Sequence, residues 1–460
     1  MAYRSVNPFD GSVLETFEEI GEDQLERAAQ TAERCFGVWR NRSFSERGAV
    51  LRRAAQVLRS RTEEFARPVT LEMGKLIKES RAEIALTADI LEYYADNAER
   101  FLAPEKLETP LGEATLESQP LGVLFGVQPW NFPYYQLARV VAPNLMAGNV
   151  VMIKHASSVP RCALAFAGLL DEAGAPAGAY TNLFVTKPQI ARLIEDPRIK
   201  GVALTGSDAA GAVVAAQAGK ALKKDTMELG GSDPFIVLED ADLDAAVKGA
   251  MWGRFHNAGQ SCVASKRLIV LEPLADRFVE KLKGAMDRLR MGNPLDEATT
   301  LAPLSSREAL DRLADQVERS LAKGARVLMG GRRVEGKGAF MEPTLLTDIK
   351  PGNPAYSEEL FGPVALFFRV PDEDAAIALA NDSPFGLGGT VFTRDVARGK
   401  RVARRIESGM VFINRATWTA PELPFGGIKR SGYGRELSRL GILEFVNRKL
   451  IRVTGVDAPY

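Results

Sequence analysis

The chain has 460 residues, with 59 basic and 59 acidic side chains and a hydrophobic fraction of 46%. This length exceeds what one hydrophobic core usually supports, so two or more packed domains are expected. The composition argues against a disordered or fibrous protein, and the balanced charge leaves no net field that would draw the chain to nucleic acid or to an anionic membrane. A small-molecule partner is therefore favoured.

Cysteine usage and the N-terminal segment predict a cytoplasmic protein. The three cysteines, Cys35, Cys162 and Cys262, are too few for a disulfide framework and fit a reducing compartment. The N-terminus lacks a basic stretch that leads into an apolar run, so no secretory signal is expected. The longest apolar runs fall far short of the roughly 20 residues that cross a bilayer, so no membrane insertion is expected.

The first elements along the chain are helical. Residues 21–100 carry apolar side chains at spacings of three and four, as in Leu51, Ala54 and Leu58, and this pattern predicts a helical layer. Within residues 105–119, a polar turn at Gly112 predicts a β-hairpin that reaches outside the body and serves oligomerisation. A plain surface loop is the alternative for this segment.

Short β-rich runs then alternate with helical ones, which is typical of parallel βαβ units. Strands are predicted near Val123, Val151, Leu183 and Val202. Helices are predicted over residues 161–172, 188–195 and 209–221. A second unit of the same kind is expected, with strands over residues 235–238, 266–271, 325–329 and 411–413. The sequence therefore predicts two α/β domains in one chain.

The segment Asn257-Ala258-Gly259-Gln260-Ser261-Cys262 delivers a cysteine after a turn of small residues. A thiolate is a strong nucleophile, and an environment that lowers the thiol pKa from roughly 8.5 would make Cys262 reactive at neutral pH. Taken alone, a cysteine is more often a small buried hydrophobe. The role of Cys262 therefore depends on its context.

Two further motifs offer partners for a nucleophile. In Met227-Glu228-Leu229-Gly230-Gly231, a carboxylate ends an apolar strand, so Glu228 is a candidate general base, with an ion-paired strand end as the alternative. In Pro129-Trp130-Asn131-Phe132-Pro133, two prolines restrict the backbone around a neutral amide. The Asn131 amide can stabilise an oxyanion, and a rigid aromatic turn is the alternative.

A nucleotide site is indicated by Leu204-Thr205-Gly206-Ser207, a strand that turns through glycine into a helix whose N-terminus can face a pyrophosphate. The segment does not complete the Gly-x-Gly-x-x-Gly form. Lys154 closes a predicted strand and can bond ribose hydroxyls, with a solvent-exposed strand end as the alternative. The only histidines are His155 and His256, and no Cys or His cluster has metal-ligand spacing, so no metal site is expected. A thiol hydrolase that pairs Cys262 with His256 remains an alternative.

Taken in order, these motifs resemble the aldehyde dehydrogenase superfamily over essentially the whole chain. Further matches are Glu358-Glu359-Leu360-Phe361-Gly362-Pro363 and Pro424-Phe425-Gly426-Gly427 with Lys429, Ser431, Gly432, Gly434, Arg435 and Glu436. The resemblance implies an α/β fold with three parts and assembly into a homodimer or homotetramer. The parts are a Rossmann-type cofactor-binding domain (1–101 and 121–230), an α/β catalytic domain (231–438) and a β-hairpin oligomerisation arm (102–120 and 439–460).

The resemblance also assigns roles by motif position. Cys262 is expected to be the nucleophile, Glu228 the general base, and Asn131 with the Cys262 backbone N–H the oxyanion hole. The implied cofactor-binding residues are Trp130, Lys154, Ser157, Gly206, Ser207, Gly230, Glu359 and Phe361. The implied reaction is NAD(P)-dependent oxidation of an aldehyde to an acid through a Cys262 thioester. An acylating dehydrogenase that releases acyl-coenzyme A is a rival of the same fold, and Glu228 argues for hydrolysis instead.

The chain looks most like the short bacterial succinate-semialdehyde dehydrogenases, with glutarate semialdehyde or a general aldehyde as alternative substrates. Arg139 follows Asn131 by eight residues, where such enzymes place an arginine that pairs with the substrate carboxylate. A structural arginine is the alternative. His256 replaces a second arginine of some relatives, and Phe425 completes the expected substrate set.

The expected cofactor is NADP or NAD. The family often distinguishes the two by an acidic residue three positions after the strand-ending lysine, which repels a 2′-phosphate, and here that position is Ser157. A hydroxyl can donate to phosphate, so NADP is slightly favoured. Ala264 stands where some relatives carry a second cysteine, so the redox switch of those relatives is not expected.

Overall fold

The computed structural model describes residues 3–110 and 112–457. The first helical layer forms as the sequence predicts, because its apolar residues recur on one face of each helix. In the first helix, for example, Leu25, Ala29, Ala32, Cys35 and Trp39 are buried. The four helices are α1 (Glu22–Trp39), α2 (Phe44–Ser60), α3 (Thr62–Met73) and α4 (Ile77–Phe101).

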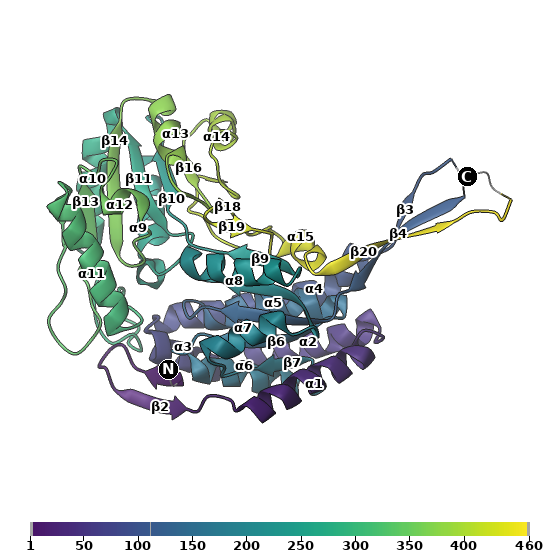
Figure 1. Cartoon of the computed structure of the whole chain (residues 1–460). Coiled ribbons are helices and arrows are strands. Elements are labelled where there is room, and N and C mark those ends of the chain that lie inside the picture. The colour runs from purple at the N-terminus through teal and green to yellow at the C-terminus, as the bar shows by residue number, and fades with distance from the viewer. Residues whose placement is uncertain (1–2, 111, 458–460) are drawn as a thin grey trace.

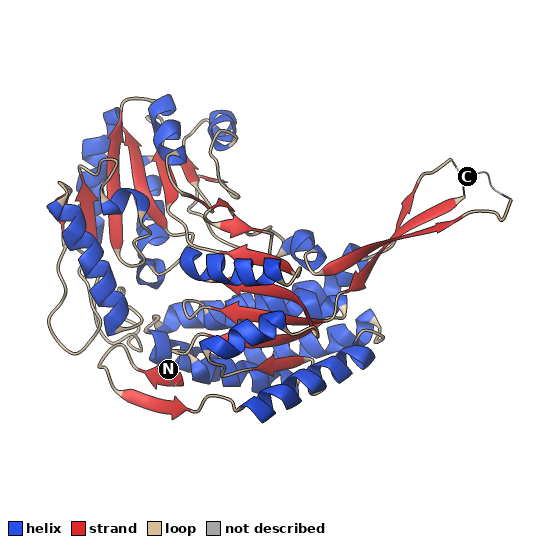
Figure 2. Ribbon diagram, viewed as in Figure 1, coloured by secondary structure: helices blue, strands red, loops and turns tan. Residues whose placement is uncertain are grey.

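The first α/β unit contains a six-stranded sheet in the order β19-β9-β8-β5-β6-β7, shown in red in the lower part of Figure 2. The strands from β5 to β9 are parallel, as predicted. They are β5 (Val123–Gln128), β6 (Val150–His155), β7 (Tyr180–Asn182), β8 (Ile199–Thr205) and β9 (Lys224–Glu228). The predicted helices correspond to α6 (Pro160–Glu172), α7 (Lys187–Glu195) and α8 (Asp208–Lys220).

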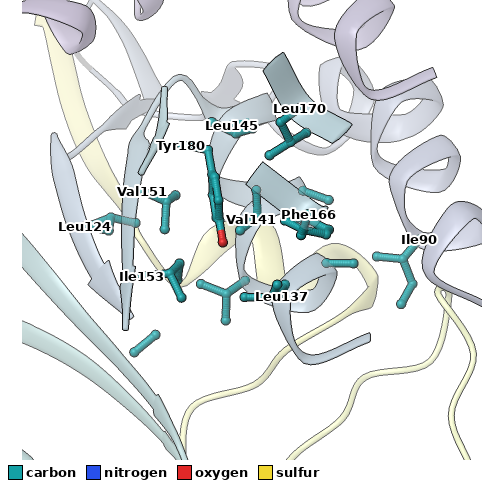
Figure 3. Packing of buried hydrophobic residues seen from close by; sticks show 14 of the residues in the cluster. Ile90, Leu124, Leu137, Val141, Leu145, Val151, Ile153, Phe166, Leu170 and Tyr180 are labelled. Atoms are coloured by element: carbon teal, nitrogen blue, oxygen red, sulfur yellow. The ribbon is translucent and has the colours of Figure 1, made fainter. Parts of the chain in front are cut away.

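Helix α5 (Pro133–Ala147) was not predicted from the sequence. Every residue of this helix is buried, so its apolar side chains show no amphipathic stripe. Figure 3 shows Leu137, Val141 and Leu145 of α5 in one cluster with side chains of the sheet and of α6. Because α5 also packs against α4, the helical layer and the sheet share one core.

The second α/β unit contains a seven-stranded sheet in the order β12-β13-β14-β11-β10-β16-β17. The ladders are parallel except at one edge, where β12 runs antiparallel to β13. The strands are β10 (Asp233–Val237), β11 (Ser265–Leu271), β12 (Arg326–Met329), β13 (Thr344–Thr347), β14 (Val364–Val370), β16 (Thr390–Phe392) and β17 (Phe412–Ile413). The helices are α9 (Leu243–Phe255), α10 (Glu272–Met286), α11 (Arg307–Ala322), α12 (Pro354–Ser357), α13 (Glu373–Asn381) and α14 (Val396–Ala403).

The two units are joined at strand β9. A short strand from late in the chain, β19 (Gly432–Tyr433), pairs antiparallel with β9 and places Gly432 opposite Glu228. Strand β18 (Ile428–Lys429), which lies just before β19 in the chain, pairs antiparallel with the distant β15 (Phe385–Gly386). The segment 424–436, called the C-terminal motif below, therefore supplies the edge strand β19 that pairs with β9, the strand that ends on Glu228.

An antiparallel arm projects from the body (Figure 1). It consists of β3 (Glu105–Leu107), β4 (Glu113–Pro120) and β20 (Val446–Val453). Strands β3 and β4 follow α4, and β20 follows helix α15 (Ser438–Leu443). The predicted projecting hairpin is confirmed, and the chain end adds a third strand to it. At the other end of the chain, β1 (Tyr3–Val6) pairs with β2 (Val13–Phe17). Among the described residues, no helix is long and apolar enough to span a bilayer.

Candidate active site

The predicted nucleophile follows a left-handed turn between the two units. The turn spans His256–Gly259 directly after α9, and φ is +52° at Asn257, +52° at Ala258 and +73° at Gly259. Gly259 is required here because a side chain would clash with the carbonyl of Gly362. This reversal carries the chain from α9 into Cys262 and then into β11.

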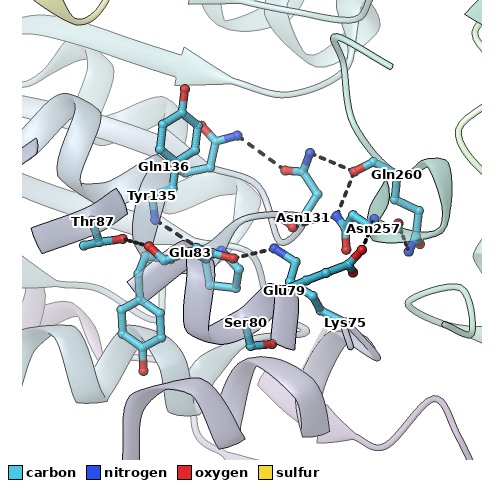
Figure 4. Close-up of polar contacts among 12 residues, drawn as sticks. Lys75, Glu79, Ser80, Glu83, Thr87, Asn131, Tyr135, Gln136, Asn257 and Gln260 are labelled. Carbon is cyan, nitrogen blue, oxygen red and sulfur yellow. Dashed lines mark hydrogen bonds and ion pairs between the residues drawn. The ribbon is translucent and has the colours of Figure 1, made fainter. Parts of the chain in front are cut away.

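A network of amides holds Asn131 against this turn (Figure 4). The Asn131 Nδ2 donates to the Gln260 carbonyl over 3.2 Å. The Asn257 Nδ2 donates to the carbonyls of Asn131 and Gln260 over 3.0 and 3.1 Å. The predicted oxyanion amide and the turn that delivers Cys262 are thus fixed to each other, although 131 residues separate Asn131 from Cys262.

Two glutamates of α4 support this network, and sequence reasoning missed both. Glu83 accepts hydrogen bonds from the backbone N–H groups of Tyr134 and Tyr135, over 2.9 and 3.2 Å, at the start of α5. Glu79 accepts from the Asn257 N–H and pairs with His256, both over 3.1 Å. The signal that could have revealed Glu83 is a charge among the buried apolar positions of a helix, because buried charges need specific partners. Glu79 is only half-buried and has no such signal.

The predicted general base, Glu228, ends β9 and is almost fully buried. In the described part of the chain, neither of its carboxylate oxygens has a hydrogen-bond partner. Burial and the neighbouring Glu436 raise the pKa of Glu228 well above its ordinary value, although Arg139 opposes the shift. A buried carboxyl group without partners keeps its proton until the charged form is stabilised.

The electrostatic surroundings of Cys262 combine burial with nearby charges of both signs. Burial raises the pKa of the Cys262 thiol to about 12, although the charges of Arg139 and Lys266 lower it. The condition named for reactivity at neutral pH, a lowered thiol pKa, is not met in the isolated protein, since desolvation outweighs the nearby cations. The resting side chain is a thiol and must lose its proton before it attacks.

Cys262 and Asn131 line a cleft of about 540 Å³ that also contains most of the expected cofactor residues. From the predicted set, the lining includes Trp130, Gly206, Ser207, Gly230, Glu359 and Phe361. Trp130 and Phe361 meet edge to face, with 5.7 Å between their ring centroids. The Glu359 carboxylate accepts from the Gly231 N–H over 3.0 Å and pairs with Lys266 over 2.9 Å.

The remaining expected cofactor residues lie near the carboxyl ends of the parallel strands. Lys154 is the penultimate residue of β6, and Ser157 follows two residues after that strand. Ser207, which lines the cleft, caps α8 directly after β8. Ligands of open parallel sheets bind at this edge. Burial lowers the pKa of Lys154. Glycine at 230 leaves room beside the Glu359 carboxylate that a side chain would fill, so the residues present fit a dinucleotide.

Arg139, which was expected to pair with the substrate carboxylate, has other partners in the structure. The Arg139 Nε lies 2.5 Å from the Glu436 Oε2, and the other guanidinium nitrogens donate to Tyr135 and Thr205. Arg139 also stacks on the ring of Phe425, with 4.5 Å to the ring centroid. Arg139 and Phe425 are both buried, and neither is among the residues that line the cleft. The guanidinium is therefore already paired and is not a free receptor for a carboxylate.

His256 does not lie beside the nucleophile in the manner that a thiol hydrolase requires. Its Nδ1 pairs with Glu79, and its ring stacks on Trp252 and meets Trp418 edge to face. His256 is absent from the residues that line the cleft with Cys262. Among the described residues, no group of three or more His, Cys, Asp or Glu side chains is arranged to hold a metal ion.

Comparison with known proteins gives close matches. The family model described as "Aldehyde dehydrogenase family" matches residues 1–451. A protein of Deinococcus radiodurans named succinate-semialdehyde dehydrogenase [NADP(+)] is 50% identical over 98% of this chain and 94% of its own length. The Escherichia coli succinate semialdehyde dehydrogenase [NAD(P)+] Sad is 43% identical over 96% of each chain. The crystal structure of succinic semialdehyde dehydrogenase from Streptococcus pyogenes with NADP+ superimposes with a TM-score of 0.97, at 46% identity, over 99% of this chain and 100% of the other.

Proposed function

The chain belongs to the aldehyde dehydrogenase family, and we propose that it oxidises succinate semialdehyde to the dicarboxylic acid, with NADP favoured over NAD as the cofactor. The names of the similar proteins support this substrate and cofactor. The observation that carries the proposal is the shared cleft, in which Cys262 and Asn131 lie together with Gly206, Ser207 and Glu359. This arrangement brings an aldehyde and a dinucleotide into one space.

An aldehyde has no leaving group, so Cys262 begins the reaction by adding to the carbonyl carbon. The Cys262 thiol gives its proton to solvent water, a carbon–sulfur bond forms, and the π electrons of the carbonyl move onto its oxygen. The Asn131 amide and the Cys262 N–H hold the resulting oxyanion. A bound nicotinamide cofactor would supply the hydride acceptor that this step requires. The product on the chain is a thioester of Cys262.

Glu228 then activates water for hydrolysis of this thioester. Once Glu228 has given its own proton to solvent, its carboxylate removes a proton from water and the oxygen adds to the thioester carbon. The carbon–sulfur bond then breaks, and the Cys262 sulfur takes up the proton that Glu228 removed from water. Because burial raises the pKa of Glu228, the carboxylate is a stronger base than an exposed one would be. A base positioned for hydrolysis favours release of the free acid over transfer to coenzyme A.

The cofactor is proposed to lie along the edge of the first sheet. Glu359 and Lys154 would bond the ribose hydroxyls, Ser207 would meet the pyrophosphate at the N-terminus of α8, and Ser157 would donate to a 2′-phosphate. Trp130 and Phe361 would flank the nicotinamide end of the cleft beside Cys262.

We also propose that the chain forms homodimers or homotetramers through the arm and acts in the cytoplasm. The arm supports the assembly because it projects from the body and exposes Leu450 and Val453, which a partner subunit can cover. The cytoplasmic location is supported by the free state of all three cysteines.

The proposal is tested by following the absorbance of the reduced nicotinamide with purified protein. Succinate semialdehyde, acetaldehyde and a long aliphatic aldehyde are each assayed with NADP and with NAD. The proposal requires the highest kcat/KM for succinate semialdehyde with NADP. Better use of the uncharged aldehydes would retain the aldehyde-oxidising mechanism and reject the substrate, and no reduction with any pair would reject the function.

A further inference from the structure

Lys266 on β11 lies fully buried between the nucleophile and the cofactor side of the cleft. Its ammonium donates to the carbonyls of Ser261 and Cys262, each over 2.9 Å, and pairs with Glu359 over 2.9 Å. A lysine has three N–H donors, and here three oxygens receive them. A buried ammonium of this kind persists only with such partners, so its position is specified by the catalytic turn and by Glu359 together.

The contact with Ser261 determines where the Cys262 N–H points. The Ser261 carbonyl and the Cys262 N–H belong to one planar trans peptide, so they point in opposite directions. Because Lys266 holds the carbonyl, the N–H is directed away from the ammonium. This N–H is the backbone donor of the proposed oxyanion hole, and its direction decides whether it can serve.

The same ammonium acts electrostatically on the Cys262 thiol. The charged groups that act on the thiol are Arg139 from α5 and Lys266 from β11, which lower its pKa, and Glu359 and Glu228, which raise it. Lys266 and Glu359 are paired, so each limits the influence of the other. Removal of either one should change the reactivity of Cys262, in opposite directions.

We propose that Lys266 is a positioning residue that orients the Cys262 peptide for oxyanion binding, and that Glu359 moderates the action of its charge on the thiol. The inference rests on the proposed function for the identity of the oxyanion. Its electrostatic part concerns the protein alone and needs neither aldehyde nor cofactor.

The first test is the rate at which iodoacetamide alkylates Cys262 in the cofactor-free protein at one fixed pH near neutrality. Peptide mass spectrometry separates Cys262 from the buried Cys35 and Cys162. Since only the thiolate reacts, each unit of pKa changes the rate by about tenfold. Lys266→Met should slow alkylation by about tenfold or more, Lys266→Arg should stay near wild type, and Glu359→Gln should accelerate it.

The matched control is Lys281→Met, which removes a lysine from a surface ion pair with Asp244 outside the cleft and should leave alkylation unchanged. If Lys266→Met does not fold, Glu359→Gln still decides the electrostatic part, because it leaves Lys266 in place. Unchanged alkylation in a folded Lys266→Met or in Glu359→Gln would overturn the proposal, as would shifts of the two variants in the same direction.

The second test measures kcat to ask whether Lys266 orients the Cys262 peptide. Lys266→Met should lower kcat for aldehyde oxidation by about 10- to 100-fold with little change in the KM for aldehyde, and Lys266→Arg should recover much of the loss. Equal kcat in Lys266→Met and wild type would remove the orienting role. If wild type reduces no cofactor while alkylation shifts as expected, the proposed function fails and the electrostatic role of Lys266 stands.

Discussion

Arg139 on α5 and Glu436 in the C-terminal motif form a buried ion pair, with 2.5 Å between the Arg139 Nε and the Glu436 Oε2. Burial raises the pKa of Glu228 and of Cys262, and the charge of Arg139 opposes both shifts. One arginine therefore connects α5 to the end of the second unit and acts on both side chains that carry the proposed chemistry.

Arg139→Ala should destabilise the protein rather than change its substrate preference. Loss of one member of a buried pair leaves the other charge uncompensated, which costs about 3–5 kcal/mol. Urea unfolding should show a decrease of about this size in the free energy of unfolding, and Arg139→Lys should lose less. Oxidation of succinate semialdehyde and of acetaldehyde should fall together. A selective rise in KM for the semialdehyde at unchanged stability would instead support the role expected from the sequence, in which Arg139 binds the substrate carboxylate.

Glu228→Gln should alter how stability depends on pH. Between the ordinary pKa of a glutamate and the raised pKa of folded Glu228, the unfolded chain releases a proton that the folded protein keeps. The stabilisation from this group is therefore complete at low pH and is lost as pH rises through that window. The free energy of unfolding of the variant, minus that of wild type, should grow by up to about 1.4 kcal/mol per pH unit there. A difference that is constant with pH would contradict the buried, protonated state.

Ser157→Glu should reverse the cofactor preference. A carboxylate at this position would repel the 2′-phosphate of NADP and leave NAD unaffected, so kcat/KM with NADP should fall by about 10- to 100-fold. Ser158→Glu, one residue further on, is the matched control for the added charge. Equal losses with both cofactors, or equal effects at both serines, would argue against a specific phosphate contact.

Leu450→Glu should weaken the proposed assembly. Leu450 lies on β20 of the arm and is 58% exposed in the single chain, so a partner subunit would bury it. Light scattering after gel filtration should show dissociation at low protein concentration. Leu164→Glu on α6, at a side chain that is 44% exposed outside the arm, is the control. An unchanged mass for Leu450→Glu would place the subunit contact elsewhere.

The sequence predicted those helices and strands whose apolar residues recur at a regular spacing. The apolar spacing in α1–α4 and the alternation of strands and helices from β5 to α8 reflect how single elements bury their apolar faces. Helix α5 was missed because it is buried on all sides and shows no periodic stripe. The edge pairing of β19 with β9 was missed because these strands are two residues long and five residues long and lie far apart in sequence.

Motif order also indicated which side chains belong to the site, but not their partners or their protonation. Sequence alone cannot show that Arg139 meets Glu436 nearly 300 residues later, or that Glu83 binds the start of α5. Sequence alone also left open whether the surroundings of Cys262 lower its pKa, and in the isolated protein burial, which is a property of the whole fold, outweighs the nearby cations. Lys266 passed unnoticed because a lysine in a buried strand has no local pattern that marks its role.

The most direct test of the account is rapid mixing of Glu228→Gln with succinate semialdehyde and NADP, followed by mass spectrometry of the Cys262 peptide. If Cys262 carries the thioester and Glu228 activates the water, the variant should reduce about one cofactor per active site in a rapid burst, then turn over slowly while an acyl adduct remains on Cys262. Cys262→Ala is the control and should give neither burst nor adduct. Steady turnover of Glu228→Gln at the wild-type rate, or a burst without an adduct on Cys262, would contradict it.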